Sequence, residues 1–222
     1  MINWQSIETV MLDMDGTLLD LHFDNFFWLQ YLPKRFADIH QQDEQQCRID
    51  LTARFEQQRG NLNWYCLDYW SEQLQVDIPA LKREVEHMIT IRPHVLSFLQ
   101  QLQQSSMQVM LVTNAHQHSL DIKMDKTGLR PLFDKLVVSH DFKRPKEQRE
   151  FWQRLKIRHP YNPATTLLID DTLSVLRSAQ DYGIQHLLTL LQPDSQQRKR
   201  EHTEFPAILH FDEIMPINNT GS

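Results

Sequence analysis

Two apolar runs end in pairs of acidic residues. The run 7-IETVMLDMD-15 ends with Asp13 and Asp15 two positions apart, and the run 165-TTLLIDD-171 ends with Asp170 and Asp171. Carboxylates held this close together repel one another, and burial adds to that cost unless a hard divalent cation neutralises them. The spacing therefore predicts a site for a cation, a phosphate group, or both.

Two other apolar runs are followed by polar residues of a different kind. The run 108-QVMLVTN-114 ends with Thr113 and Asn114, and Lys146 follows the run 135-KLVVSH-140. A hydroxyl group and an ammonium group can hydrogen-bond and neutralise the oxygens of a phosphoryl group in transfer. An isolated acidic pair is common in turns and helix caps, so the prediction depends on all four segments and on their order.

Together these residue types suit Mg²⁺-dependent hydrolysis of a phosphate monoester. An aspartate can attack phosphorus and form an aspartyl-phosphate, which divides one difficult step into two. A neighbouring aspartate can protonate the leaving alcohol and then deprotonate the attacking water. The backbone N–H groups from Met14 to Gly16 are expected to bind the phosphate, because glycine lets the chain turn closely around an anion.

The order of the runs indicates a parallel α/β fold that would bring these residues together. A fifth run, 185-QHLLTLL-191, follows the other four, and helices are expected over residues 94–106, 118–128, 146–159 and 173–183. Ligands of open parallel sheets bind beyond the carboxyl ends of the strands, where the polar residues of this chain stand. We therefore predict a Rossmann-like, doubly wound parallel sheet.

Residues 19–91 interrupt this alternation of strands and helices. They contain no convincing buried strand, and segments such as 24-DNFFWLQYL-32 and 61-NLNWYCLDYWSEQL-74 are helical in period and rich in aromatic residues. We predict an all-helical insertion over 19–91, placed after the first strand of a core formed by 1–18 and 92–222.

Composition narrows the classes of function. The 222 residues can bury a sizeable core, and the net charge of −6 argues against binding to nucleic acid or to an anionic membrane. The one basic stretch, 197-QRKRE-201, is short and is expected to be solvated. No apolar run approaches the ~20 residues of a membrane span, and the N-terminus lacks a secretory pattern. The two cysteines, Cys47 and Cys66, suit a reducing cytosol. We expect a cytoplasmic monomer or weak homodimer, in which the sequon at Asn218 is idle.

In its motifs the chain resembles the haloacid dehalogenase superfamily of phosphohydrolases. Four segments carry the resemblance and span most of the chain, in the order that the superfamily shows: 13-DMDGT-17, 111-LVTN-114, 144-RPKE-147 and 167-LLIDD-171. The resemblance implies that the insertion is the cap of this family, which closes over the substrate and excludes water.

The resemblance also implies a role for each matched residue. Asp13 would be the nucleophile and Asp15 the general acid and base, while Thr113 and Lys146 contact the phosphoryl group. Mg²⁺ would be held by Asp13, by the backbone carbonyl of Asp15 and by Asp171, with Asp170 in support. The aspartate at position 15 indicates phosphate esters, because the dehalogenases of the superfamily lack that acid.

Within the superfamily the chain is most similar to the bacterial GMP/IMP nucleotidases. The similarity lies in 15-DGTLLDLHFDNFFW-28, 62-LNWYCLDYWSEQL-74 and 113-TNAH-116, and it implies a purine 5′-monophosphate as substrate. Aromatic rings can stack on a purine base, although rings at helical spacing more often form a core. The candidates for substrate contact are Asp24, Asn25, Trp28, Trp64 and Tyr65, with Tyr31 and Tyr69 as further aromatic residues.

Other functions remain open at this point. A phosphatase for sugar phosphates or phosphoglycolate, or a phosphomutase, would share the core motifs, because the cap selects the substrate. A signalling receiver also combines acids, a hydroxyl group and a lysine, but it places the acidic pair first and the acceptor aspartate on a middle strand. A non-catalytic phosphate-binding protein is the third alternative.

A histidine pair and an arginine outside the motifs are further candidates for a functional role. His116 and His118 have the spacing of metal ligands, but no cysteine or third histidine lies near them in the sequence to complete a zinc site. We therefore place them in a loop, with His116 near the phosphate or the leaving group. Arg92 precedes Pro93 where the chain returns from the insertion, and it is a candidate hinge residue and a candidate catalytic residue.

Overall fold

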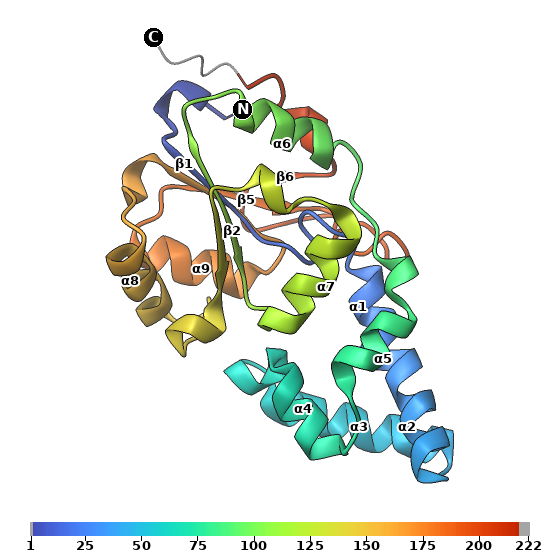
Figure 1. The fold of residues 1–222 in the computed structure, drawn as a ribbon. Coiled ribbons are helices and arrows are strands. Elements are labelled where there is room, and N and C mark those ends of the chain that lie inside the picture. Colours follow the sequence, from blue (N-terminus) through green and yellow to red (C-terminus); the bar gives the residue numbers. More distant parts are fainter. Residues whose placement is uncertain (1, 218–222) are drawn as a thin grey trace.

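A parallel sheet of six strands forms the centre of the molecule. The computed structural model describes residues 2–217, and its strands stand in the order β3-β2-β1-β4-β5-β6 (Figure 1). Every neighbouring pair of strands is parallel. The strands are β1 Thr9–Leu12, β2 Gln108–Thr113, β3 Lys135–Val138, β4 Thr166–Ile169, β5 His186–Leu190 and β6 Ala207–Ile208.

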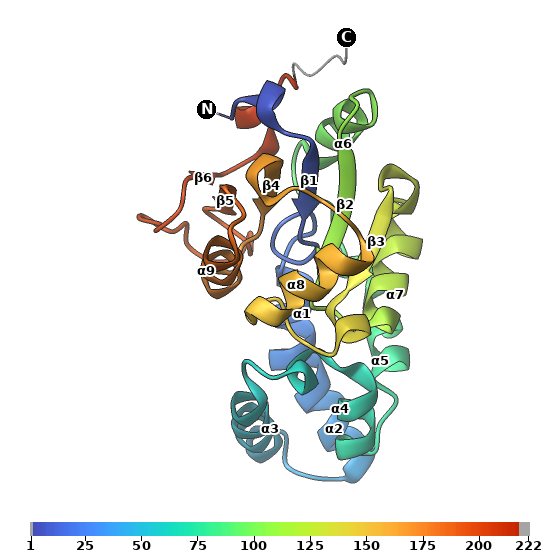
Figure 2. The ribbon, with the colours of Figure 1, turned by 90° about the vertical axis from the view of Figure 1, so that its left-hand side faces the viewer.

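Helices cover both faces of this sheet. Successive residues of a strand point to opposite faces, and β1 shows the consequence. Leu12 belongs to a core cluster with residues of α6 (Val95–Gln103) and α7 (Gln117–Thr127). Met11 belongs to a second cluster with residues of α8 (Arg149–Arg158) and α9 (Leu173–Tyr182). In Figure 2, α6 and α7 lie on one side of the strands and α9 on the other. The prediction of a doubly wound α/β sheet is confirmed.

The elements agree with the predicted runs except at two places. The helix that was expected from residue 146 begins at Arg149, because residues 145–148 form a turn that carries Lys146. β6 was not predicted, since it has two residues and no apolar run marks it. The basic stretch at 197–201 is a mostly exposed loop, but Arg200 reaches inward and donates to the backbone carbonyl of Asp171 at 2.8 Å.

Residues 19–91, which lie between β1 and α6, form a group of helices at one end of the sheet (Figure 1). Figures 1 and 2 show α2, α3 and α4 farthest from the strands, with α1 and α5 nearer to them. This confirms a helical cap inserted after the first strand. Its elements are α1 His22–Phe26, a π-helical segment Phe27–Tyr31, α2 Leu32–His40, α3 Glu44–Gln58, a 3-10 turn Leu62–Tyr65, α4 Leu67–Leu74, α5 Ile78–Glu84 and a 3-10 turn Glu86–Met88.

The two connections to these helices lie side by side. Leu19 and Ile91 form an antiparallel bridge, and the backbone N–H of Arg92 donates to the carbonyl of Leu18 at 3.0 Å. The buried guanidinium of Arg92 donates to backbone carbonyls, including those of Pro193 at 3.0 Å and Leu209 at 3.1 Å. Arg92 therefore fastens the connection to the C-terminal loops, which accounts for its charge without a catalytic role.

Helix caps come from short polar side chains next to the helices. The carboxylate of Asp43 accepts from the N–H of Gln46 at 2.8 Å, and that of Asp77 accepts from the N–H of Ala80 at 2.9 Å. Each such cap contributes about 1 kcal/mol. The insertion therefore contains its own signals for where α3 and α5 begin.

No helix within residues 2–217 has both the length and the apolar character needed to cross a membrane. The sequon at 218–220 lies outside the residues that the structure describes.

Candidate active site

The polar residues that follow the strands meet at the carboxyl edge of the sheet. Lys146 stands at the centre of the group, with its Nζ atom 2.5 Å from Asp13 Oδ1 and 2.7 Å from Asp170 Oδ2. The same ammonium group donates to the backbone carbonyl of Val112 at 3.0 Å. One buried lysine thus contacts two aspartates that lie 133 and 24 positions away from it in the sequence.

Three carboxylates form a compact, buried cluster beside this lysine. Asp13, Asp170 and Asp171 each present an oxygen, and these oxygens all lie within 4.8 Å of one another. Oxygen donors at such spacing fit a hard cation such as Mg²⁺. The side chain of Asp15 points elsewhere, so the ligand expected from that residue is its backbone carbonyl.

Gly16 is required beside this cluster. Its φ angle is +79°, and a Cβ atom there would lie 2.7 Å from both Cγ and Oδ2 of Asp171. Any other residue would be strained and would collide with that carboxylate. The backbone N–H of Asp171 donates to Thr17 Oγ1 at 3.1 Å, which fixes Asp171 against the same turn.

The cluster is electrostatically unfavourable without a cation. Burial raises the pKa of Asp13 to about 7, although Lys146 opposes the shift. Burial, together with Asp170 and Asp13, raises the pKa of Asp171 well above its usual value. Burial alone would lower the pKa of Lys146, but Asp13 and Asp170 outweigh it and raise that pKa. One ammonium group thus faces three carboxylates, and a divalent cation would restore the balance.

Asp15 belongs to a second set of buried charges. Lys123 Nζ lies 2.6 Å from Asp15 Oδ1 and 2.7 Å from Asp24 Oδ2, and Lys82 Nζ lies 2.8 Å from Asp24 Oδ1. The four residues form a chain of alternating charge that runs from the first motif through α7 and α1 to α5. Both lysine side chains are at most 2% exposed.

This chain of charges sets the protonation of its carboxylates. Burial and the nearby Asp24 raise the pKa of Asp15 to about 6, while Lys123 opposes the shift. Burial would also raise the pKa of Asp24, but Lys123 and Lys82 outweigh it and lower that pKa to about 2. Asp24 is therefore ionised at neutral pH, and Asp15 has a pKa suited to giving and taking a proton.

Neither lysine of this series of four charged residues was identified from the sequence. Lys123 stands three positions after Leu120 and next to Met124, on the buried face of α7, and Lys82 stands four positions after Ile78. A lysine at an apolar position of a helical period was the available signal, since an unpaired buried lysine is costly.

A cavity of about 380 Å³ lies over the acidic residues and is lined by residues of the core and of the insertion. All five residues proposed for substrate contact line it, whereas Tyr31 and Tyr69 stand outside its lining; the Tyr31 hydroxyl contacts Glu84 instead. Met14, Gly16 and Asp170 are not part of the cavity lining, and the Met14 side chain is in the core. From the insertion the lining comprises Leu21, Asp24, Asn25, Trp28, Leu29, Thr52, Phe55, Glu56, Arg59, Trp64, Tyr65, Leu67, Trp70 and Lys82.

The insertion contacts the core directly beside Lys146. The Tyr65 hydroxyl donates to Glu147 Oε1 at 2.7 Å, and Asn114 Nδ2 donates to Glu147 Oε2 at 2.9 Å. Asn114 Oδ1 also accepts from the backbone N–H of Lys146 at 2.9 Å. Asn114 was expected to bind phosphate; here its amide positions the turn that carries Lys146. Glu147 was missed because only the fold brings it to Tyr65.

Comparison with known proteins agrees with this geometry. The family described as haloacid dehalogenase-like hydrolase matches residues 10–189. GMP/IMP nucleotidase YrfG from Escherichia coli (strain K12) is 37% identical over 215 residues, which is 97% of each chain, and GMP/IMP nucleotidase YrfG from Shigella flexneri has the same identity and coverage.

Solved structures show the same fold at low sequence identity. An HAD phosphatase from Thermococcus onnurineus has a TM-score of 0.75 and 17% identity, over 90% of this chain and 93% of that one. The putative HAD-hydrolase YfnB from Bacillus subtilis, solved bound to magnesium, has a TM-score of 0.59 and 20% identity, over 94% of this chain and 96% of that one.

Proposed function

Since the chain belongs to the haloacid dehalogenase-like hydrolases, we propose that it is a Mg²⁺-dependent phosphatase that hydrolyses purine nucleoside 5′-monophosphates, GMP and IMP, to nucleoside and phosphate. The observation that carries the proposal is the cavity, which has carboxylates and a lysine at its base and aromatic rings in its walls. The choice of a purine nucleotide is supported by the 37% identity to a protein named GMP/IMP nucleotidase.

In the proposed mechanism Asp13 attacks phosphorus and forms an aspartyl-phosphate. Asp15 protonates the leaving 5′-oxygen and then removes a proton from the water that hydrolyses the intermediate. Lys146, Thr113 and the backbone N–H groups of residues 14–16 stabilise the charge on the phosphoryl oxygens. Asp13, Asp171 and the Asp15 carbonyl, with Asp170 in support, would hold Mg²⁺, which would supply positive charge to offset the carboxylates and the phosphate.

The insertion is proposed to act as the substrate cap. Its boundaries at 19 and 91 coincide with the paired connections at Leu19 and Ile91, where a hinge would lie. Trp28 and Trp64 are proposed to stack on the base, and Asp24, Asn25 and Tyr65 to contact the substrate, because all five residues line the cavity. Cys47 and Cys66 are free thiols, and we propose the cytosol as the site of action.

Phosphate release from a panel of substrates tests the proposal. The panel contains 5′-, 3′- and deoxynucleotides, sugar phosphates and phosphoglycolate, each with Mg²⁺ and with EDTA. We expect Mg²⁺-dependent release that is fastest with IMP and GMP. Faster release from sugar phosphates would retain the mechanism and overturn the substrate. No release from any compound would overturn the enzymatic function and favour a phosphate-binding protein.

A further inference from the structure

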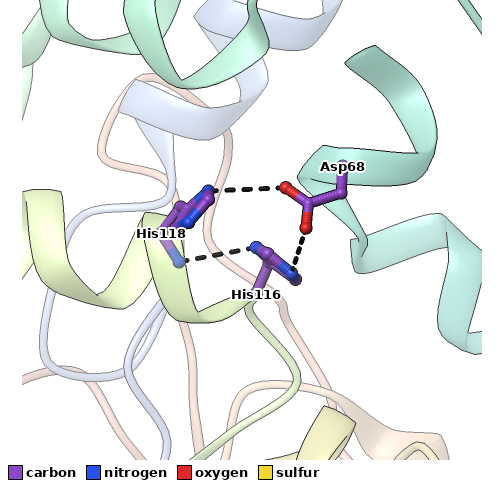
Figure 3. Close-up of side chains that lie close together, drawn as sticks. All are labelled: Asp68, His116 and His118. Atoms are coloured by element: carbon purple, nitrogen blue, oxygen red, sulfur yellow. Dashed lines mark hydrogen bonds and ion pairs between the residues drawn. The ribbon is translucent and has the colours of Figure 1, made fainter. Parts of the chain in front are cut away.

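A second group of potential metal ligands lies at the junction of the insertion and the core. Asp68 stands in the first turn of α4, and His116 and His118 stand at the start of α7 (Figure 3). The carboxylate faces both rings, with Oδ1 3.4 Å from His118 Nδ1 and Oδ2 3.5 Å from His116 Nε2. One ligand atom from each residue lies within 4.8 Å of the other two.

These separations fit metal coordination better than direct hydrogen bonds. An N–H···O hydrogen bond joins atoms about 2.7–3.2 Å apart, so both Asp68–histidine contacts are long for that interaction. Ligands at about 2.0–2.2 Å from a tetrahedral metal ion are roughly 3.3–3.6 Å apart, and the two Asp68–histidine separations of 3.4 and 3.5 Å fall in that range. Two imidazoles and one carboxylate leave a fourth position for water.

The sequence alone did not support such a site, because nothing near His116 and His118 in the chain completes it. The fold supplies the third ligand, Asp68, from the insertion. We propose that Asp68, His116 and His118 form a binding site for a divalent transition metal of the Zn²⁺ type, separate from the cluster of three carboxylates.

The donor atoms also define the class of metal. Imidazole nitrogen favours Zn²⁺, Co²⁺ and Ni²⁺, whereas Mg²⁺ prefers oxygen ligands. Coordination through Nε2 of His116 puts a proton on Nδ1, so the contact that Nδ1 accepts from the His118 N–H is lost. That contact is 3.4 Å long and weak, and its loss costs little. The His140 ring, whose centroid is 5.0 Å from that of His116, packs edge-on and limits its rotation.

A metal ion here would join the insertion to the core at the rim of the cavity. Asp68 belongs to α4 of the insertion, and His116 both lines the cavity and is the N-cap residue of α7 in the core. The ion would therefore hold α4 against the core and oppose opening of the cap. This consequence for turnover rests on the proposed function, whereas binding of the metal does not.

Titration with Co²⁺ in the presence of excess Mg²⁺ tests the site directly, because tetrahedral Co²⁺ absorbs strongly in visible light. We expect one equivalent of Co²⁺ to give this absorption in the wild-type protein. Asp68→Asn and His118→Ala should abolish the band or raise the Kd for Co²⁺ at least tenfold. Both side chains are more than half exposed, so neither replacement leaves a buried void.

Two control variants separate this site from others. Asp171→Asn alters the carboxylate cluster and should leave the Co²⁺ band unchanged, as should His202→Ala, which removes an exposed histidine elsewhere. An unchanged band in His118→Ala, a band lost in Asp171→Asn, or no tetrahedral band in the wild-type protein would overturn the proposal.

A second measurement tests the effect on the cap. Zn²⁺ should slow Mg²⁺-dependent phosphate release by the wild-type protein, and Asp68→Asn should need at least tenfold more Zn²⁺ for the same fractional loss, measured against its own rate without Zn²⁺. Equal sensitivity of the two proteins would show that the ion does not act through this site. Absence of phosphatase activity would overturn the proposed function and leave the Co²⁺ result standing.

Discussion

Asp13 is the residue on which the proposed chemistry most directly depends. In Asp13→Asn the side chain keeps its shape and an oxygen that can accept from Lys146, but an amide cannot attack phosphorus. We expect the rate of phosphate release to fall by about a thousandfold or more, while thermal unfolding shows an intact fold. Substantial residual activity in a folded variant would contradict the assignment of Asp13 as the nucleophile.

Lys123 is expected to act through Asp15, which it contacts at 2.6 Å. Lys123→Met keeps the length of the side chain but removes the charge that positions this carboxylate. Release from a nucleotide, whose alkoxide leaving group needs a proton, should fall roughly a hundredfold. Release from p-nitrophenyl phosphate, whose leaving group needs no proton, should fall much less.

Lys126→Met, at an exposed position of the same helix, serves as the control and should leave both rates near those of the wild-type protein. An equal loss with both substrates would show that Lys123 supports the fold rather than the proton transfer. Lys123→Met also leaves Asp15 and Asp24 without their shared partner, so its thermal unfolding must be measured as well. A large fall in the melting temperature would indicate a role in the fold, whereas a nearly unchanged one would indicate a role in proton transfer.

Residue types and spacing were sufficient to find one part of the site. Asp13, Thr113 and Asp171 follow apolar runs directly, so their place at the sheet edge could be predicted from the sequence. Lys123 and Lys82 could not be placed in that way, because their partners lie 108 and 58 positions away. Only the packing of α7 and α5 against the first motif brings those charges together.

At the scale of elements, the helical period of the insertion was readable but its orientation was not. Aromatic residues recur at helical spacing through residues 24–32 and 61–74, and this pattern predicts helices without showing which ring faces the substrate. Trp28 and Trp64 line the cavity, whereas Tyr31 and Tyr69 do not. The difference depends on how the π-helical segment Phe27–Tyr31, the 3-10 turn Leu62–Tyr65 and α4 are oriented in the insertion, which the helical period does not fix.

Trp64 tests the role of the aromatic wall in selecting a base. Trp64 lies under the guanidinium of Arg59, at 5.5 Å from ring centroid to Cζ, in the cavity lining. Trp64→Leu should raise KM for IMP by roughly tenfold, because stacking on a base contributes about 1–3 kcal/mol. KM for ribose 5-phosphate, which has no base, should change little.

Tyr31→Phe changes a cap aromatic residue outside the cavity lining and is the matched control for Trp64→Leu. It should leave the ratio of the two KM values unchanged. If Trp64→Leu raised both KM values equally, the ring would be acting as part of the cap core and the proposed stacking would be wrong.

At the scale of the whole molecule, the buried carboxylates oppose folding when no cation is bound. The pKa of Asp13 rises from 3.8 to about 7 on folding, so between these values the folded state binds more protons than the unfolded state. Stability contributed by this group is therefore present at low pH and is lost as the pH rises toward 7. His140 has the opposite sign, because burial lowers its pKa to about 4.

Comparing Asp171→Asn with the wild-type protein isolates the effect of the carboxylate cluster on the free energy of unfolding. Both proteins contain the same histidines, so the effect of the histidines cancels in the difference. With EDTA at about pH 7.5, the variant should be more stable than the wild-type protein by about 1–2 kcal/mol, and the difference should shrink near pH 5. Mg²⁺ should stabilise the wild-type protein and have little effect on the variant, since a ligand is lost.

Urea unfolding measures each free energy, and Asp125→Asn, at an exposed position of α7, is the control for removing one negative charge. If Mg²⁺ stabilised Asp171→Asn as strongly as the wild-type protein, Asp171 would not be a Mg²⁺ ligand. The repulsion between the carboxylates of the cluster would then be no evidence for a cation site.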